Sequence, residues 1–252
     1  MQKSKTQSGF LGFLEKFIRR YVIIYYLMRS LAIKFNIFEE DFNILKKIFG
    51  SRKINIIDIG ASDGISANFF IKNLNVQKIF CYEPHLFFIK KLKEIKKKFS
   101  QIEIFDYGIS SNNKDIYVYI PMINFFKKKI YLLTYTFYNY KELKEQIKLD
   151  FVNNNRIVIK KLKLKLRKFE LIKSKIDLIK IDVNGYENEI VKSLKKQILK
   201  DRPILVVENN SKLDKTSKFL NNLGYKRYFN KNNNLLKHKN QNVLDVFYIY
   251  KK

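Results

Sequence analysis

The chain has 252 residues, and 51 Lys and Arg against 23 Asp and Glu give it a formal net charge of +28. Hydrophobic residues make up 46% of the chain, which excludes an intrinsically disordered protein because a core can form. One cysteine excludes a disulfide framework and a thiolate zinc site. The length is that of one α/β domain with a small appendage.

The positive charge comes almost entirely from lysines, which accompany Asn, Ile, Phe and Tyr throughout the sequence. Such an even distribution predicts a solvated lysine-covered surface rather than a dedicated nucleic-acid patch. The chain also contains no RNP, zinc-finger or homeodomain pattern. We therefore expect no specific nucleic-acid partner.

Residues 1–52 are predicted to form an N-terminal helical extension, and residues 53–252 the main domain. Within 9–38, apolar and aromatic residues alternate with arginines, and the longest uncharged apolar run covers 21–28. A membrane-spanning helix needs about 20 apolar residues, so this run is too short. We expect one or two helices that pack on the domain, with an amphipathic helix on a membrane surface as the alternative. The predicted location is the cytoplasm, and peripheral contact with the inner membrane surface is an alternative within this prediction.

From residue 53 onward, predicted strands and helices alternate, which indicates a parallel sheet covered by helices on both faces. The middle of the chain interrupts this alternation with three extra strands and one helix. Because it departs from the regular pattern, this segment is predicted to form part of the substrate-binding side. No repeat or linker is visible. The predicted strands are 53–59, 78–83, 102–107, 115–120, 129–137, 156–166, 176–182, 203–208, 225–229 and 243–250, and the predicted helices are 66–73, 85–98, 140–149, 186–197 and 213–223; residues 232–234 and 237–242 are predicted to be a polar loop.

The strongest local motif is a hydrophobic strand that runs through Asp58 into the turn Gly60-Ala61-Ser62-Asp63-Gly64. Glycines permit positive φ and a close approach of the backbone to a ligand. In open α/β sheets, ligands bind beyond the carboxyl ends of the strands, where this turn is predicted to lie.

An acidic residue follows at the end of the second predicted strand. Glu83 comes 23 residues after Gly60, close to the spacing of about 20 at which an acid binds ribose hydroxyls in nucleotide-type cofactors. A dinucleotide site would need three turn glycines to place a pyrophosphate, and this turn has two. A two-glycine turn with a downstream acid favours S-adenosylmethionine, which has no pyrophosphate.

A third group of polar residues ends two further predicted strands. Asp182 follows Ile179-Lys180-Ile181, and Glu208 follows a run that begins at Arg202-Pro203. Both carboxylates are predicted to face the same crevice at the carboxyl edge of the sheet.

Together these motifs resemble those of the FkbM-type S-adenosylmethionine-dependent methyltransferases. The resemblance covers about 55–250, and the Ile-Lys-Ile-Asp-Val-x-Gly-x-Glu signature ending at Glu187 is its most specific part. It implies a Rossmann-like α/β sandwich whose mostly parallel, seven-stranded sheet ends in an antiparallel last strand, here with N-terminal helices added. The chain departs from the family at Asn184, where the family usually has Glu.

The resemblance also implies roles for individual residues. Asp182 is the first candidate for the general base that takes the acceptor's proton, Glu208 is the second and His85 the third. The cofactor-binding candidates are Asp58, Gly60, Ala61, Ser62, Gly64, Glu83, Pro84, Asp106, Tyr107 and Asp182. No metal site is expected, although Asp182, Glu208 and Asn209 carry the oxygen ligands that hard cations prefer.

The predicted function is methylation of a hydroxyl group of a sugar, glycan or other small molecule, with the glycan part resting on family analogy. Two alternatives stay open at this point. One is an RNA methyltransferase that uses the basic surface, and the other is a non-catalytic protein at a membrane surface. The acceptor, the oligomeric state and the effect of Asn184 are not specified by the sequence.

Overall fold

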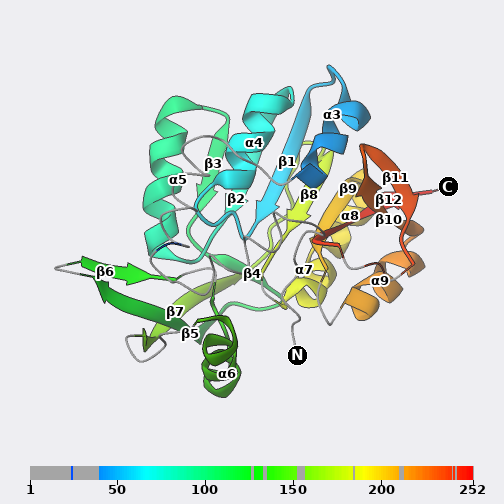
Figure 1. Cartoon of the computed structure of the whole chain (residues 1–252). Coiled ribbons are helices and arrows are strands. Elements are labelled where there is room, and N and C mark those ends of the chain that lie inside the picture. Colours follow the sequence, from blue (N-terminus) through cyan, green and yellow to red (C-terminus); the bar gives the residue numbers. More distant parts are fainter. Residues whose placement is uncertain are drawn as a thin grey trace. The chain divides into compact units, whose positions relative to one another are not determined.

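The protein is described by a computed structural model, which covers residues 24, 40–125, 128–132, 135–151, 157–183, 185–209, 213–239, 241 and 243–251 (Figure 1). Within these, residues 40–114 and 165–251 form one compact unit, and residues 115–164 belong to a second. Apart from residue 24, the predicted helices within 9–38 lie outside the described residues, and the proposed boundary at residue 52 stays a prediction. In the described part of the chain, no helix is long and apolar enough to cross a membrane.

The first unit is built around an eight-stranded sheet with the strand order β11-β10-β12-β9-β8-β1-β2-β3. The five strands from β9 to β3 are parallel, and β12 runs antiparallel to both β9 and β10. The predicted α/β sandwich with its antiparallel last strand is therefore confirmed, with one strand added at the edge. The strands are β1 (Ile54–Ile59), β2 (Val76–Tyr82), β3 (Ile102–Phe105), β8 (Leu178–Ile181), β9 (Ile204–Glu208), β10 (Tyr225–Lys231), β11 (Asn234–Lys237) and β12 (Asp245–Tyr250).

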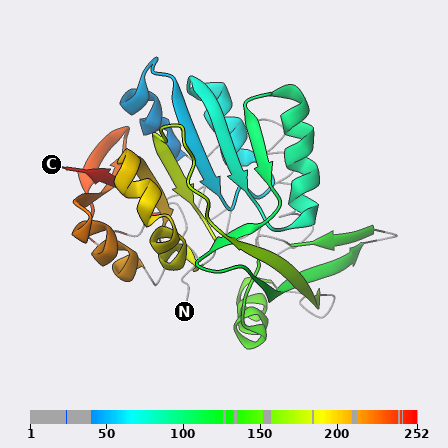
Figure 2. The same cartoon turned by 180° about the vertical axis from the view of Figure 1, so that it is seen from behind.

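Helices cover both faces of this sheet and create two hydrophobic cores (Figures 1 and 2). Because side chains alternate along a strand, Ile56 of β1 packs in one core and Ile57 in the other. The first core contains residues of α3 (Asn43–Phe49), α4 (Ile65–Asn73) and α5 (Leu86–Lys98); the second contains residues of α7 (Glu187–Ser193), α8 (Lys195–Asp201) and α9 (Leu213–Asn222). A short 3₁₀ helix, Glu40–Phe42, precedes α3.

Cys81 lies in the first core, on β2, with no exposed surface. Burial, followed by the nearby Asp58 carboxylate, raises the pKa of its thiol well above the ordinary value. Cys81 is thus a small core residue in which the thiolate form is disfavoured.

The eighth strand corrects the prediction of a polar loop after residue 231. Asn232 and Asn233 both have positive φ, at 51° and 56°. Two successive left-handed residues form the turn that best joins antiparallel strands, and asparagine tolerates this conformation. The asparagine-rich segment is thus the turn of a hairpin between β10 and β11.

The helix predicted for 186–197 is also different, because it consists of two short helices. Leu194 separates α7 from α8 with ψ near 1°, which is outside the helical range. Its side chain is fully buried in the second core. The break allows both short helices to cover the sheet beside β8 and β9.

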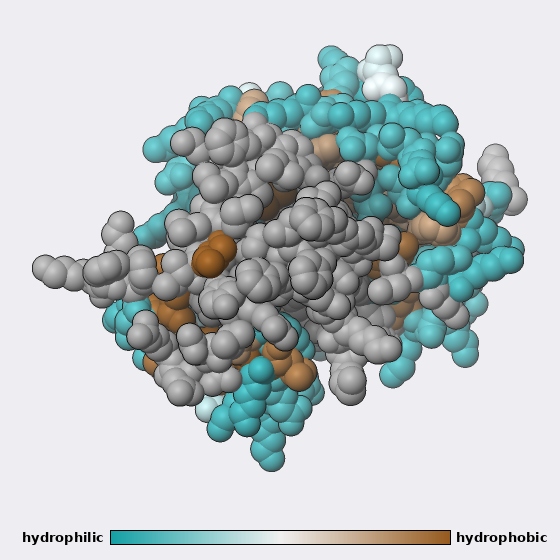
Figure 3. All heavy atoms as spheres, in the orientation of Figure 1, coloured by the Kyte–Doolittle hydropathy of each residue, from teal (hydrophilic) through white to brown (hydrophobic). Residues whose placement is uncertain are grey.

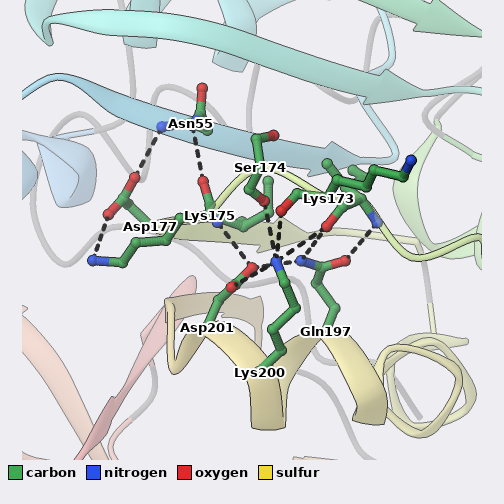
Figure 4. A network of polar contacts seen from close by, with 10 residues as sticks. Asn55, Lys173, Ser174, Lys175, Asp177, Gln197, Lys200 and Asp201 are labelled. Atoms are coloured by element: carbon green, nitrogen blue, oxygen red, sulfur yellow. Dashed lines mark hydrogen bonds and ion pairs between the residues drawn. The ribbon is translucent and has the colours of Figure 1, made fainter.

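A polar network joins the amino-terminal ends of β1 and β8 to α8 (Figure 4). Lys200 donates hydrogen bonds from Nζ to the carbonyl oxygens of Ile172, Lys173 and Ser174, at 3.0–3.4 Å. The backbone N–H of Asn55 donates to Asp177 at 3.1 Å. This network stabilises the edge of the sheet opposite to the strands' carboxyl ends, so it supports the scaffold rather than the candidate site.

The second unit contains the segment that interrupts the strand–helix alternation. Its elements are β5 (Lys114–Phe125), β6 (Lys128–Tyr131), α6 (Tyr140–Asp150) and β7 (Ile157–Lys168), and with β4 (Gly108–Ser110) the strands form a sheet of order β4-β7-β5-β6. The N-terminal residue of α6 follows Asn139, whose Oδ1 accepts a hydrogen bond from the Lys141 N–H at 2.8 Å. The predicted strands and helix of this segment exist, although β6 is shorter than expected.

Candidate functional site

The turn after β1 lies against the ends of the two neighbouring strands. The Gly60 N–H donates to the Tyr82 carbonyl oxygen at 3.0 Å, on the β2 side. On the β8 side, a Cβ placed on Gly60 would lie 1.9 Å from the carbonyl oxygen of Asp182. With φ at 73° as well, only glycine fits here, so the turn after β1 and the end of β8 are packed backbone to backbone.

Gly64 needs glycine for another reason. Its φ is 84°, and an added Cβ would lie 2.4 Å from Ile95 Cδ1 and 3.1 Å from Leu92 Cδ2, both on α5. The second turn glycine therefore permits close packing of α5 over the start of α4. Of the two predicted glycines, Gly60 is the one whose backbone lies at the junction of β1 and β8.

Glu83 is buried at the end of β2 and holds the turn from the other side. Its Oε2 accepts a hydrogen bond from the Ser62 N–H and its Oε1 accepts one from the His85 N–H, both at 2.8 Å. Burial raises the pKa of Glu83 from 4.5 to about 7, although these two hydrogen bonds and the charge of Lys180 act in the opposite direction. A carboxylate can accept about four hydrogen bonds, and Glu83 accepts two from these backbone N–H groups. It can therefore accept two more, from a pair of neighbouring hydroxyl groups on a ligand.

A buried ion pair lies beneath the turn. Asp58 and Lys180 are direct neighbours on the adjacent parallel strands β1 and β8. The Lys180 ammonium lies 3.3 Å from Asp58 Oδ1, donates to the Gly60 carbonyl oxygen at 3.0 Å and lies 3.6 Å from Asp182 Oδ2. The hydroxyl of Ser66 on α4 donates to the other Asp58 oxygen at 2.6 Å. Lys180 thus connects β1, its turn and the end of β8.

Asp182 is the member of this group that reaches solvent, with 46% of its side chain exposed. The turn that follows it is held by Glu187 at the start of α7, whose Oε1 accepts hydrogen bonds from the Val183 N–H at 3.2 Å and the Gly185 N–H at 2.9 Å. Glu187 is therefore a turn-stabilising residue at a helix N-terminus. Asn184, where the chain departs from the family pattern, lies outside the described residues.

Glu208, the second candidate base, ends the next strand, β9. It lies directly opposite Asp245 of β12, and Asp245 is buried. The neighbouring Asn209 donates from Nδ2 to the Val243 carbonyl oxygen at 2.9 Å, so its amide nitrogen holds the segment before β12. In the described part of the chain, no three His, Cys, Asp or Glu side chains gather in a way that could hold a metal ion.

His85 follows Pro84 and occupies the N-cap position of α5, but its side chain makes no capping hydrogen bond. Its ring is 7% exposed and packs edge-on against Phe88 with centroids 5.9 Å apart. Burial lowers its pKa from 6.5 to about 4. The His85 ring is buried, whereas the Asp182 side chain is 46% exposed, so a substrate can reach Asp182 more readily and His85 ranks behind it.

Aromatic side chains cluster at the ends of β2 and β3. The rings of Tyr82 and Phe105 are stacked, with centroids 4.5 Å apart and planes 8° apart, and Tyr107 meets both rings edge-on at 5.8 Å. Tyr107 is half-buried and Asp106 is exposed. This cluster forms the β3 side of the candidate site, where Asp106 and Tyr107 were predicted to bind the cofactor.

Two residues of the network, Lys180 and Ser66, were not predicted to belong to the site. A lysine inside the four-residue buried strand Leu178–Ile181 was the available signal, because lysine is almost never buried without a partner. Ser66 carried no comparable signal, since a polar residue in the first turn of a helix is common.

A family model, the methyltransferase FkbM domain, matches residues 58–227. The chain belongs to the FkbM methyltransferase family. The match begins at Asp58 near the end of β1 and includes the glycine turn, Glu83, Lys180, Asp182 and Glu208. No curated protein matches this chain.

Solved methyltransferase structures are similar to the chain at low sequence identity. The methyltransferase FkbM of Methylobacillus flagellatus KT is 14% identical with a TM-score of 0.50, over 79% of this chain and 44% of that protein. The present chain therefore matches less than half of that protein's length. A precorrin-6y C5,15-methyltransferase of Geobacter metallireducens GS-15 is 15% identical with a TM-score of 0.43, over 83% of this chain and 86% of that one.

S-adenosylmethionine is the cofactor of this methyltransferase family, and the residues at the site fit it. The Lys180 ammonium lies within 3.6 Å of both the Asp58 and the Asp182 carboxylates, so two carboxylates share one ammonium here. Such an excess of negative charge suits a ligand that carries a sulfonium and an ammonium group. Glu83 would hold the ribose hydroxyls, and the turn from Gly60 to Ser62 would approach the methionine part.

Proposed function

We propose that this FkbM domain transfers a methyl group from S-adenosylmethionine to a hydroxyl group of a sugar, a glycan or another small molecule. The observation that carries the proposal is the position of Asp182. It is the half-exposed carboxylate of a group that is otherwise buried, and it follows the strand next to the glycine turn. The glycan as acceptor is supported by the family resemblance alone.

The chemistry assigns separate tasks to the residues of the site. The bound cofactor supplies an electrophilic methyl group on a positively charged sulfur. When the acceptor oxygen takes the methyl group, the Asp182 carboxylate would receive the proton of the acceptor hydroxyl. Lys180 lies 3.6 Å from that carboxylate and orients it. Glu83, which accepts a hydrogen bond from the Ser62 N–H of the turn, would hold the cofactor in position for the acceptor.

The first experiment is titration calorimetry with S-adenosylhomocysteine, the product form of the cofactor. Wild type is compared with Glu83→Gln, which keeps the shape of the side chain and removes its charge. The control is Glu103→Gln, at a 46% exposed glutamate on β3 that lies 3.8 Å from the surface residue Lys78. We expect binding by wild type and the control, and a loss of about tenfold or more for Glu83→Gln. A folded wild type that does not bind would contradict the proposal.

An acceptor screen then tests the second half of the proposal. Methyl-labelled S-adenosylmethionine is incubated with the protein and with sugars, sugar conjugates, small phenols and RNA, and the labelled product is identified. With an acceptor in hand, Asp182→Asn is expected to reduce kcat by about 10²–10⁴-fold while S-adenosylhomocysteine still binds. If Glu208→Gln causes the larger loss of kcat, the base is Glu208 instead. Label found only on RNA would overturn the sugar assignment.

A further inference from the structure

A polar groove runs along α9 on the antiparallel side of the first unit, away from the candidate active site. It has a volume of about 530 Å³ and lies between α9, the start of β10 and the end of β11. Lys226 and Arg227 lie near the amino-terminal end of β10, whereas the methyltransferase residues lie at the carboxyl ends of β1, β2 and β8. The groove is therefore a separate feature of the same unit. Its lining residues are Asp214, Ser217, Lys218, Asn221, Asn222, Lys226, Arg227, Lys237 and His238.

The chemistry of this lining is donor-rich. Four lining residues are lysine or arginine and one is aspartate, and two asparagines and a serine add neutral donors. Every lining residue carries a charged or polar group, which favours a polar ligand. Burial lowers the pKa of His238, so the imidazole is neutral at physiological pH and the positive charge comes from the lysines and Arg227.

Arg227 is held in a defined orientation within the groove. Its Nη1 lies 3.4 Å from Asp214 Oδ1 and donates to Ser217 Oγ at 3.3 Å. The Ser217 hydroxyl is in turn 2.6 Å from the Tyr248 hydroxyl, and both side chains are buried. The guanidinium is thus positioned by α9 and by β12, which lowers the entropic cost of binding an anion. The flexible lysines surround this fixed donor.

We propose that the α9 groove binds the phosphate groups of a small phosphorylated ligand. A volume of this size is within the range of small-molecule sites. Planar guanidinium groups match phosphate oxygens, and lysines add point charges that neutralise them. The surface over α9 and the C-terminal strands is mostly hydrophilic in Figure 3, in agreement with an open polar site.

The test must separate a groove from a uniformly basic surface, because the whole chain carries a charge of +28. The groove variant is Lys218→Gln/Lys226→Gln/Lys237→Gln, at three exposed positions of the lining. The matched control is Lys93→Gln/Lys96→Gln/Lys97→Gln, at three exposed positions of α5. Both variants lower the formal net charge by three, from +28 to +25.

The probe is inorganic tripolyphosphate, whose binding is measured by titration calorimetry at physiological salt. We expect wild type and the α5 control to bind within about threefold of each other, and the groove variant to bind about tenfold or more weakly. Arg227→Lys keeps the charge but removes the planar fork, and it should also weaken binding. Equal losses in the two triple variants would overturn the proposal, as would binding of an RNA oligonucleotide without binding of tripolyphosphate. S-adenosylhomocysteine affinity should be unchanged in the groove variant, so this result is independent of the methyltransferase assignment.

Discussion

The ammonium of Lys180 lies 3.3 Å from the carboxylate of Asp58, and both side chains are buried on adjacent parallel strands. Removing one partner from such a pair leaves an uncompensated charge in the core. This destabilises the protein more than replacing both partners with apolar residues would. Because the same ammonium also binds the Gly60 carbonyl oxygen and faces Asp182, the pair couples the stability of the sheet to the geometry of the cofactor turn.

Replacing Lys180 with methionine should lower the free energy of unfolding by about 3–5 kcal/mol. The matched control is Lys175→Met, since Lys175 lies 3.6 Å from Asp177 but has 71% of its side chain exposed. That surface pair should contribute less than about 1 kcal/mol. Urea denaturation of both variants measures the difference. Similar losses of unfolding free energy in the two variants would show that Lys180 does not stabilise the buried Asp58 carboxylate.

Replacing Ser66 with alanine should remove the second support of Asp58, because the serine hydroxyl donates to its Oδ2 at 2.6 Å in a buried position. A hydrogen bond to a buried charge is worth about 1.5–3 kcal/mol. Ser193→Ala is the control, since its hydroxyl donates to the Glu189 carbonyl oxygen within a helix and is only part-buried. Thermal and urea unfolding should show a clearly larger loss for Ser66→Ala. The hypothesis is wrong if the order is reversed.

The pH dependence of stability should report on Glu83, whose pKa is raised to about 7 in the folded protein. An acid with a higher pKa when folded binds more protons in the folded state, so its contribution to the unfolding free energy is complete below about pH 4.5. That contribution is lost as the pH rises toward 7. Between about pH 5 and about pH 8, the unfolding free energy of wild type should therefore fall relative to that of Glu83→Gln. A difference that is constant over this range would contradict the raised pKa.

Gly60→Ala should disrupt the junction of β1 and β8, because the added Cβ would lie 1.9 Å from the Asp182 carbonyl oxygen. Gly50→Ala isolates the cost of positive φ alone, since Gly50 has φ at 54° and no atom within 4 Å of an added Cβ. The control should lose about 1–2 kcal/mol, and Gly60→Ala should lose more and bind S-adenosylhomocysteine weakly. Unfolding and calorimetry on both variants check this. Equal effects would mean that the turn can move away from β8 without cost.

Much of the first unit could be predicted from local sequence. Buried strands such as β1 and β8 consist mostly of Ile and Leu, with one or two polar residues, and this is typical of strands covered on both faces. Asp58, Glu83 and Asp182 were expected at one edge because parallel strands present their carboxyl ends together. These predictions depend on pattern and topology, both of which a sequence carries.

Other features depend on register and packing between distant segments. That Lys180 faces Asp58 follows from a pairing across more than a hundred residues, which periodicity does not specify. The close approach of Ile95 and Leu92, on a different helix, to Gly64 likewise depends on packing between distant segments. The Asn232-Asn233 turn was mistaken for a loop because polar composition alone does not distinguish a hairpin turn from an irregular segment.

The burial of Cys81 has a practical consequence for spectroscopy. It is the chain's one cysteine, it has no exposed surface, and its pKa is raised. Alkylating dyes react with accessible thiolates, so the native protein should stay unlabelled. A cysteine introduced at Tyr138, an exposed position, would then accept a single fluorophore without removal of the natural thiol. The protein is in this sense ready for site-specific labelling, and its fluorescence could follow ligand binding in solution.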